Sequence, residues 1–378
     1  MDYWENITSN HADMSKEFPS GKEGMKAVQY LASFFKQHGC NELTTDHPLM
    51  NRLSVGSEPN YRWLIQYSRK LITASLIDGF HSVAKRFSNP SEYLSAHNEM
   101  EVALKLHLGG LKVAFSQIEK TAKPDLYVMK NGYKTNVEVT SLNPPEEERL
   151  IHTLYSGILV FTSHPKIIAG GLIAGAPSDK ERGIIIEEVK KAREDVIQLG
   201  VTRSIRFPGI ATIYLAPRDN AEKIPEECRD AFSIIQPNRR AIEDLTVRKM
   251  KDKYDQVAAD SGAGLLYIYT EMADRQKLLS LFETDPNSVD LALATYPQLQ
   301  GLVLTVPHRG IHVVSAVKSS GSEVKRRGNN VFFESSPGEY QGESTIMWVN
   351  SHAAKYLPEY IKQAIENYSS NLRKLSPL

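Results

Sequence analysis

Two short segments decide the fold of this chain: Lys123-Pro124-Asp125-Leu126-Tyr127-Val128 and, after a turn at Gly132, Asn136-Val137-Glu138-Val139-Thr140-Ser141. Apolar and polar residues alternate in both segments, which predicts two β-strands joined as a hairpin. The alternation puts the leucine and the valines on one face, and Asp125, Glu138 and Thr140 on the other. Carboxylates on neighbouring strands suit hard cations such as Mg²⁺ or Mn²⁺. The hairpin is therefore predicted to be a metal site.

The composition describes a chain with a sizeable core and no net charge. It has 378 residues, 41% of them hydrophobic, and its 45 basic residues balance its 45 acidic ones. A whole-chain basic signal for nucleic acid is missing, although a local basic groove stays open. The two cysteines, Cys40 and Cys228, are far apart, which argues for a reducing compartment and against a disulfide scaffold or a cysteine-rich zinc site. Without a signal-peptide pattern or an apolar run of about 20 residues, we expect a cytoplasmic protein that does not span a membrane.

The apolar pattern predicts an α/β fold with two parts. Residues 1–90 show helical spacing and are expected to form an N-terminal helical subdomain. Residues 91–378 alternate helices with strands, which favours a sheet flanked by helices in one α/β domain. Helices are expected at 91–108, 179–199, 240–259, 273–282 and 352–372, and strands at 112–117, 210–215, 264–270, 299–306, 311–317, 331–334 and 345–349.

The order of these features resembles the PD-(D/E)XK nuclease superfamily. A helix with a glutamate precedes three strands, with Pro124-Asp125 on the second strand and, after a gap of 12 residues, Glu138-Val139-Thr140 on the third. The resemblance covers about 50 residues and implies a restriction-endonuclease-like mixed sheet flanked by helices. It also implies a metal-dependent endonuclease that cuts DNA, in restriction or genome defence, as a homodimer or with a partner subunit. Asp125, Glu138 and the backbone carbonyl of Val139 would then hold Mg²⁺ or Mn²⁺.

The helix before the hairpin carries two glutamates. Apolar residues at +3, +4 and +7 from Glu99 put it on the rim of the buried face, where the superfamily's helix glutamate lies. Glu101 is displaced by about 200° because each residue turns a helix by ~100°. Glu99 is therefore preferred as the third carboxylate, holding an outer water of the metal or a second ion.

One residue departs from the superfamily's motif. Thr140 stands where the motif has a lysine, and its hydroxyl can hydrogen-bond a water but carries no charge. Lys112, Lys123 and Lys134 are nearby candidates for a relocated lysine, none of them compelling. The departure favours a second interpretation, a catalytically inactive nuclease-fold protein that binds nucleic acid or serves as an assembly subunit. A third interpretation is an unrelated α/β domain with no metal site.

A basic run lies outside this core. Lys325, Arg326 and Arg327 fall in the polar segment 319–330, which is expected to be a loop. The run is either simply solvated or a clamp for DNA phosphates. Two weaker patterns favour structural interpretations. The pair His308 and His312 is expected at a surface turn. The glycine-rich segment 170–177 lacks the lysine of a phosphate-binding loop and is expected to be a flexible or packing segment.

Overall fold

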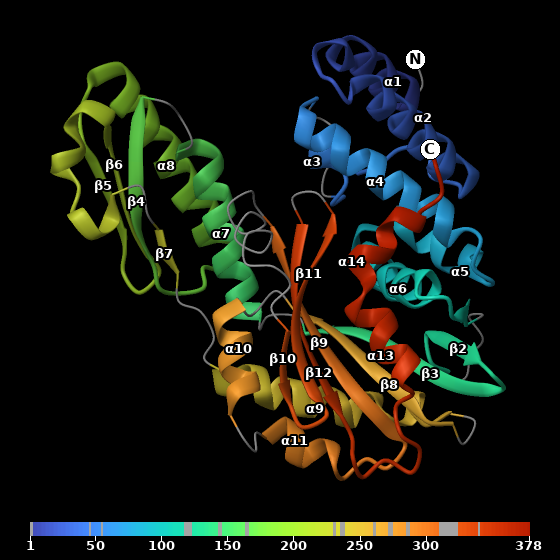
Figure 1. Ribbon diagram of the computed structural model, residues 1–378. Helices are drawn as coiled ribbons and strands as arrows, with labels where there is room; N and C mark the ends of the chain where they lie inside the picture. Colours follow the sequence, from blue (N-terminus) through green and yellow to red (C-terminus); the bar gives the residue numbers. More distant parts are fainter. Residues whose placement is uncertain are drawn as a thin grey trace. The chain divides into compact units, whose positions relative to one another are not determined.

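The computed structural model shows a mixed α/β protein with a large mixed sheet flanked by helices (Figure 1). It describes residues 3–44, 47–53, 56–116, 123–142, 146–162, 166–229, 232–234, 239–259, 262–270, 275–284, 288–309, 324–338 and 341–378. Two compact units divide the chain: a main unit, Met1–Leu142 with Ile242–Leu378, and an inserted unit, Asn143–Ala241. This division differs from the predicted one. Residue 90 is not a boundary, because the N-terminal helices share one core with the sheet.

Among the described residues, eight strands form the sheet of the main unit, in the order β1-β2-β3-β8-β9-β12-β11-β10. Strands β1, β2 and β3 form an antiparallel meander, β3, β8 and β9 run parallel, and β9, β12, β11 and β10 are antiparallel again. The bounds are β1 (Lys112–Phe115), β2 (Leu126–Lys130), β3 (Tyr133–Leu142), β8 (Gly264–Thr270), β9 (Leu299–Arg309), β10 (Val324–Arg327), β11 (Asn330–Gly338) and β12 (Gln341–Val349).

Helices cover both faces of this sheet. One face packs against the N-terminal and C-terminal helices, in a core that includes Val137, Val139 and Tyr267. The other face packs against three helices that follow the inserted unit and lie before or beside β9, in a core that includes Leu266 and Ile268. The first set is α1 (Tyr3–Met14), α2 (Gly21–Gln37), α3 (Met50–Leu53), α4 (Glu58–Ala74), α5 (Phe80–Ala84), α6 (Pro90–Leu108), α13 (Glu359–Glu366) and α14 (Tyr368–Asn371); the second is α9 (Arg239–Val257), α10 (Arg275–Glu283) and α11 (Ser288–Leu293).

The helix that carries both glutamates, α6, begins and ends close to where the sequence predicts. Asn89 caps it by accepting a hydrogen bond from the backbone N–H of Ser91, and it ends at Gly109. Strand β8 also has the predicted bounds. The C-terminal helix was predicted from residue 352 but begins at 359, directly after Pro358. Proline lacks a backbone N–H and fits only the first turn of a helix, so the helix cannot run through it.

The inserted unit has its own sheet and core. Its strands run in the order β5-β6-β4-β7, and helices α7 and α8 bury apolar side chains against one face. The helix α8 starts with a capping box made by Ser178 and Glu181 and ends at Gly200, whose φ of 65° is left-handed. The bounds are α7 (Glu146–Thr162), β4 (Ile167–Ile173), α8 (Asp179–Leu199), β5 (Arg203–Phe207), β6 (Ala211–Pro217) and β7 (Phe232–Ile234).

Two segments contain strands that were not predicted. Residues 170–173 of the glycine-rich segment form the end of β4, where Gly171 lets the backbone of β6 approach closely. The basic run forms β10, which pairs with β11 around a turn at Gly328. The strand predicted at 311–317 lies outside the described residues, as does His312. No helix in the part of the chain that the structure describes is both long enough and apolar enough to cross a membrane.

Candidate functional site

The hairpin of β2 and β3 places two carboxylates side by side. Leu126 pairs with Val137, and both lie in the core beneath the sheet, as the alternation predicts. Asp125 directly precedes β2 and stands opposite Glu138 by the same register. The backbone N–H of Val139 donates to Asp125 Oδ2 at 2.8 Å. This hydrogen bond fixes the Asp125 carboxylate against the strand that carries Glu138.

Glu138 is buried and only half satisfied. It is 1% exposed. Lys253 of α9 donates hydrogen bonds from Nζ to Glu138 Oε1 at 2.8 Å and to Gln256 Oε1 at 2.8 Å. Glu138 Oε2 is buried without a hydrogen-bond partner among the residues that the structure describes. Burial raises the pKa of Glu138, and the charge of Lys253 works against that rise. A buried oxygen of a carboxylate is costly to leave unpaired, so this oxygen marks a place for a ligand.

Glu99 of α6 is the third carboxylate of the cluster. Arg86, in the turn before α6, donates from Nη1 to both Glu99 oxygens at 2.8 and 2.7 Å, and Ser95 Oγ donates at 3.1 Å. Burial and then the negative charge of Asp125 raise the pKa of Glu99 to about 7. Burial and then the charge of Glu138 raise the pKa of Asp125 to about 7. The three carboxylates therefore act on one another electrostatically, as neighbours in one cluster do.

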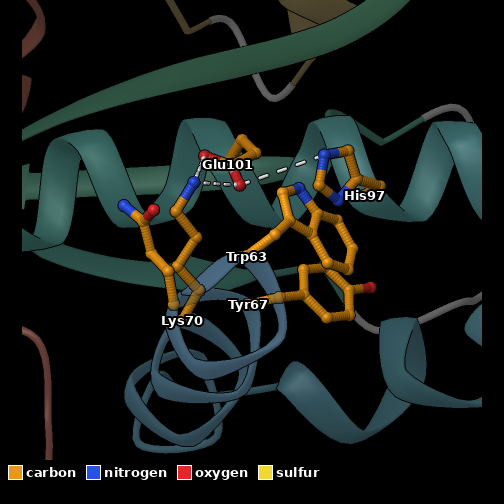
Figure 2. A pocket seen from close by; sticks show the side chains of 6 residues that line it. Trp63, Tyr67, Lys70, His97 and Glu101 are labelled. Atoms are coloured by element: carbon orange, nitrogen blue, oxygen red, sulfur yellow. Dashed lines mark hydrogen bonds and ion pairs between the residues drawn. The ribbon is translucent and has the colours of Figure 1, made fainter. Parts of the chain in front are cut away.

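Glu101, two residues further along α6, has a different environment (Figure 2). Lys70 donates to its two oxygens at 2.7 and 2.9 Å, as the dashed lines of Figure 2 show. The Tyr368 hydroxyl donates to Oε2 at 2.8 Å. Burial opposes ionisation of Glu101, but the charges of Lys70 and His97 and these hydrogen bonds outweigh it and lower the pKa to about 2. The adjoining cavity, about 10 Å³, has room for about one water molecule. Glu101 is thus a structural ion-pair member, and the preference for Glu99 agrees with the geometry.

Two of the three lysines named as stand-ins for the motif lysine lie away from the carboxylates, and the third, Lys123, stands two residues before Asp125. Lys112 and Lys134 both stand opposite Met129, four residues along β2 from Asp125. At ~3.3 Å per residue this separation is about 13 Å. Lys134 holds its ammonium 3.9 Å from the centre of the Tyr127 ring. The lysine at the site is Lys253, which sequence reasoning missed.

Two residues named with the motif sit beside the pair. Thr140 follows Glu138 by two positions in β3, so it shares its face of the sheet, and it is partly exposed. Val139 lies between them, with its side chain in the core and its N–H bound by Asp125. Its carbonyl belongs to the same short stretch of backbone. The structure thus groups Glu99, Asp125, Glu138, Val139 and Thr140, together with Lys253.

The basic run does not reach this cluster. Strand β10 forms the opposite edge of the sheet, with four strands between it and β3. Each of its cations already pairs with an acidic side chain: Lys325 with Glu283 at 3.0 Å, Arg326 with Glu366 at 2.9 Å, and Arg327 with Asp290 at 2.5 Å. A phosphate clamp made by these residues stays a prediction, and it would act far from the carboxylates.

A metal at this site would need oxygen from the backbone. No group of three or more His, Cys, Asp or Glu side chains within the described ranges is arranged to hold a metal ion by itself. The hairpin offers two carboxylates and the neighbouring Val139 carbonyl, and hard cations accept backbone carbonyl ligands. The unpaired Glu138 Oε2 fits that use.

Comparison with known proteins adds no assignment: the sequence matches no model of a protein family and no curated protein. The function is therefore argued from the residues and the geometry of this chain.

Proposed function

We propose that the protein is a metal-dependent nuclease that hydrolyses phosphodiester bonds of DNA on a restriction-endonuclease-like core. The observation that carries the proposal is the cluster of Asp125, Glu138 and Glu99 with Lys253 at its edge. Lys253, on a helix distant in sequence, supplies the positive charge that is absent at Thr140. Restriction or genome defence is the setting that the resemblance suggests.

The charge of the cluster favours a divalent cation. Three carboxylates face two cations, Arg86 and Lys253. Burial first, and then the charge of a neighbouring carboxylate, raise the pKa values of Glu99 and Asp125 to about 7. When all three carboxylates are ionised they carry one more charge than the two cations, and Mg²⁺ or Mn²⁺ would balance it.

Each side chain has a role in such a reaction. Asp125, Glu138 and the Val139 carbonyl would hold the cation, which when bound activates water and neutralises charge on the phosphate. Lys253 hydrogen-bonds Glu138, so its ammonium is positioned to orient the attacking water and to stabilise negative charge on the phosphoryl oxygens. The hydroxyl of Thr140 adds a neutral hydrogen bond on the same face.

Supercoiled plasmid incubated with the protein and Mg²⁺ or Mn²⁺ tests the proposal. The wild-type protein should convert it to nicked or linear DNA, and Asp125→Ala should lower the rate by roughly a thousandfold, since several kcal/mol of charge stabilisation disappear. Lys253→Ala should lower it by roughly a hundredfold. Lys251→Ala is the matched control, because Lys251 is an exposed lysine on the same helix, and it should leave the rate unchanged. Cutting by Asp125→Ala at the wild-type rate would exclude this site.

A second candidate function belongs to the same fold. The absent motif lysine at Thr140, and the two hydrogen bonds by which Arg86 already holds Glu99, favour a nucleic-acid-binding or assembly subunit without catalysis. Such a protein would bind DNA but would cut none in any divalent metal. Cleavage that depends on the metal and on Asp125 separates the two functions.

A further inference from the structure

We propose that the open face of the β1–β2–β3 meander guides DNA to the carboxylates, with Lys112 and Lys134 holding a phosphate. This inference rests on the proposed function, because it extends the same site. It names the surface that binds the substrate, which the basic run on β10 does not provide.

The register of the meander lines up three rows of residues on this face. Lys112, Met129 and Lys134 are paired in the first row. Ala114, Tyr127 and Asn136 are paired in the second. The third row, two residues further along each strand, holds Asp125 opposite Glu138. Side chains two apart in a strand point the same way, so all three rows share one face.

Side chains on this face of β1 and β2 are exposed to solvent, whereas those on the opposite face are buried. In β1 and β2 the alternate residues Val113, Phe115, Leu126 and Val128 are buried in the core. The residues between them are partly or fully exposed, namely Lys112, Ala114, Tyr127 and Met129. Helix α9 reaches as far as β3, where Asn136 Nδ2 donates to the carbonyls of Val257 and Ala259, both at 2.9 Å. Asn136 is therefore buried, and the surface of partly exposed side chains runs from β2 to the edge strand β1.

The charges of this face are ordered along the strands. Lys112 and Lys134 flank Met129 at one end, and neither of the first two rows contains an acidic residue. The Tyr127 ring lies under the Lys134 ammonium at 3.9 Å, which holds that cation above the sheet. The carboxylates lie about 13 Å away, at four residues of ~3.3 Å each. A polyanion is therefore bound at one end of the face while its backbone reaches the carboxylates at the other.

DNA is the occupant that fits both ends. Its phosphates repeat regularly along each strand, so one phosphate can lie on the lysines while another lies at the cluster. Contacts of lysine to phosphate position a nucleic acid without reading its sequence. The face thus supplies a local basic surface on a chain whose net charge is zero.

Fluorescence anisotropy of a labelled DNA duplex in EDTA, at several salt concentrations, tests this surface without cleavage. The double variant Lys112→Ala/Lys134→Ala should bind more weakly and reduce the slope of log affinity against log salt by about 1, because the two lysines hold one phosphate. Tyr127→Leu should weaken binding less, because it removes only the support of Lys134. Lys130→Ala is the control: Lys130 is in β2 too, but it lies 5.0 Å from the ring of Tyr360 on the opposite face.

The outcomes keep this inference apart from the nuclease proposal. A double variant with the wild-type affinity and salt slope overturns the inference, even if the wild-type protein cuts plasmid. A wild-type protein that binds no duplex overturns it as well. A reduced slope in a protein that cuts DNA in no metal supports the surface and removes the nuclease. Lys112 and Lys134 are exposed, so a loss of slope with an unchanged circular dichroism spectrum is not a loss of fold.

Discussion

Glu99 and Glu101 lie two residues apart on one helix, and both are buried, yet their surroundings have opposite effects. Lys70 and Tyr368 saturate Glu101, and its pKa falls to about 2. Glu99 has Arg86 as its cation, but burial and then the charge of Asp125 raise its pKa to about 7. The helix thus carries one carboxylate whose charge is matched and one whose charge is not.

This difference distinguishes a charged pair that stabilises the fold from a charged cluster that could bind a ligand. A matched buried pair contributes order, and breaking it is costly because it leaves one uncompensated charge. An unmatched cluster costs stability in the free protein, which is a feature of sites that await a ligand. The unpaired Glu138 Oε2 belongs to the unmatched cluster. Two substitutions test whether the contrast holds.

The larger effect is expected at the matched glutamate. Glu101→Ala should lower the free energy of unfolding by about 3–5 kcal/mol, because Lys70 would remain buried without its partner. Urea denaturation measures the loss. The double variant Lys70→Met/Glu101→Leu, which removes both charges, should lose much less. A loss below about 1 kcal/mol in Glu101→Ala would show that this pair is not the structural one.

The smaller effect, of opposite sign, is expected at Asp125. Its pKa is raised to about 7 in the folded protein, whereas an unfolded chain has a value near ~3.9. Between these values the folded state binds more protons than the unfolded state, so the contribution of Asp125 makes stability fall as pH rises through that window. Asparagine does not ionise. Asp125→Asn should therefore be more stable than the wild-type protein at pH 8 without metal, by roughly 2 kcal/mol, and less so at pH 5.

Urea denaturation at the two pH values measures this difference. Exposed Asp252→Asn on α9 is the control and should change neither value. If Asp125→Asn were less stable than the wild-type protein at pH 8, the Asp125 carboxylate would be structural.

Local pattern predicts the carboxylates and not the cations. The alternation in the hairpin places Asp125 and Glu138 on one face, and helical spacing separates Glu99 from Glu101, because both signals lie within a few residues. Lys253 is 115 residues from Glu138, and Arg86 is 13 residues from Glu99. Their contacts depend on how α9 and the turn before α6 pack, and no short pattern in the sequence encodes that packing.

The same reason limits the prediction of the fold. The regular alternation of helices and strands predicts a mixed α/β protein, which the structure shows. The alternation does not reveal that Asn143–Ala241 forms a separate unit, because this unit is built from helices and strands like the rest of the chain. The polar, glycine-containing pattern of 319–330 predicts a loop, whereas pairing with β11 makes Val324–Arg327 an edge strand, β10.

Metal binding tests the central claim most directly. Mn²⁺ titrated into metal-stripped protein at pH 7 in a calorimeter should bind at one site with release of protons, because the Glu99 and Asp125 carboxyls are partly protonated there. Two buffers that differ in ionisation enthalpy count the protons, and Asp125→Asn should bind far more weakly. Absence of binding at millimolar Mn²⁺, or equal binding by Asp125→Asn, would contradict the assignment of Asp125 and Glu138 as a cation site.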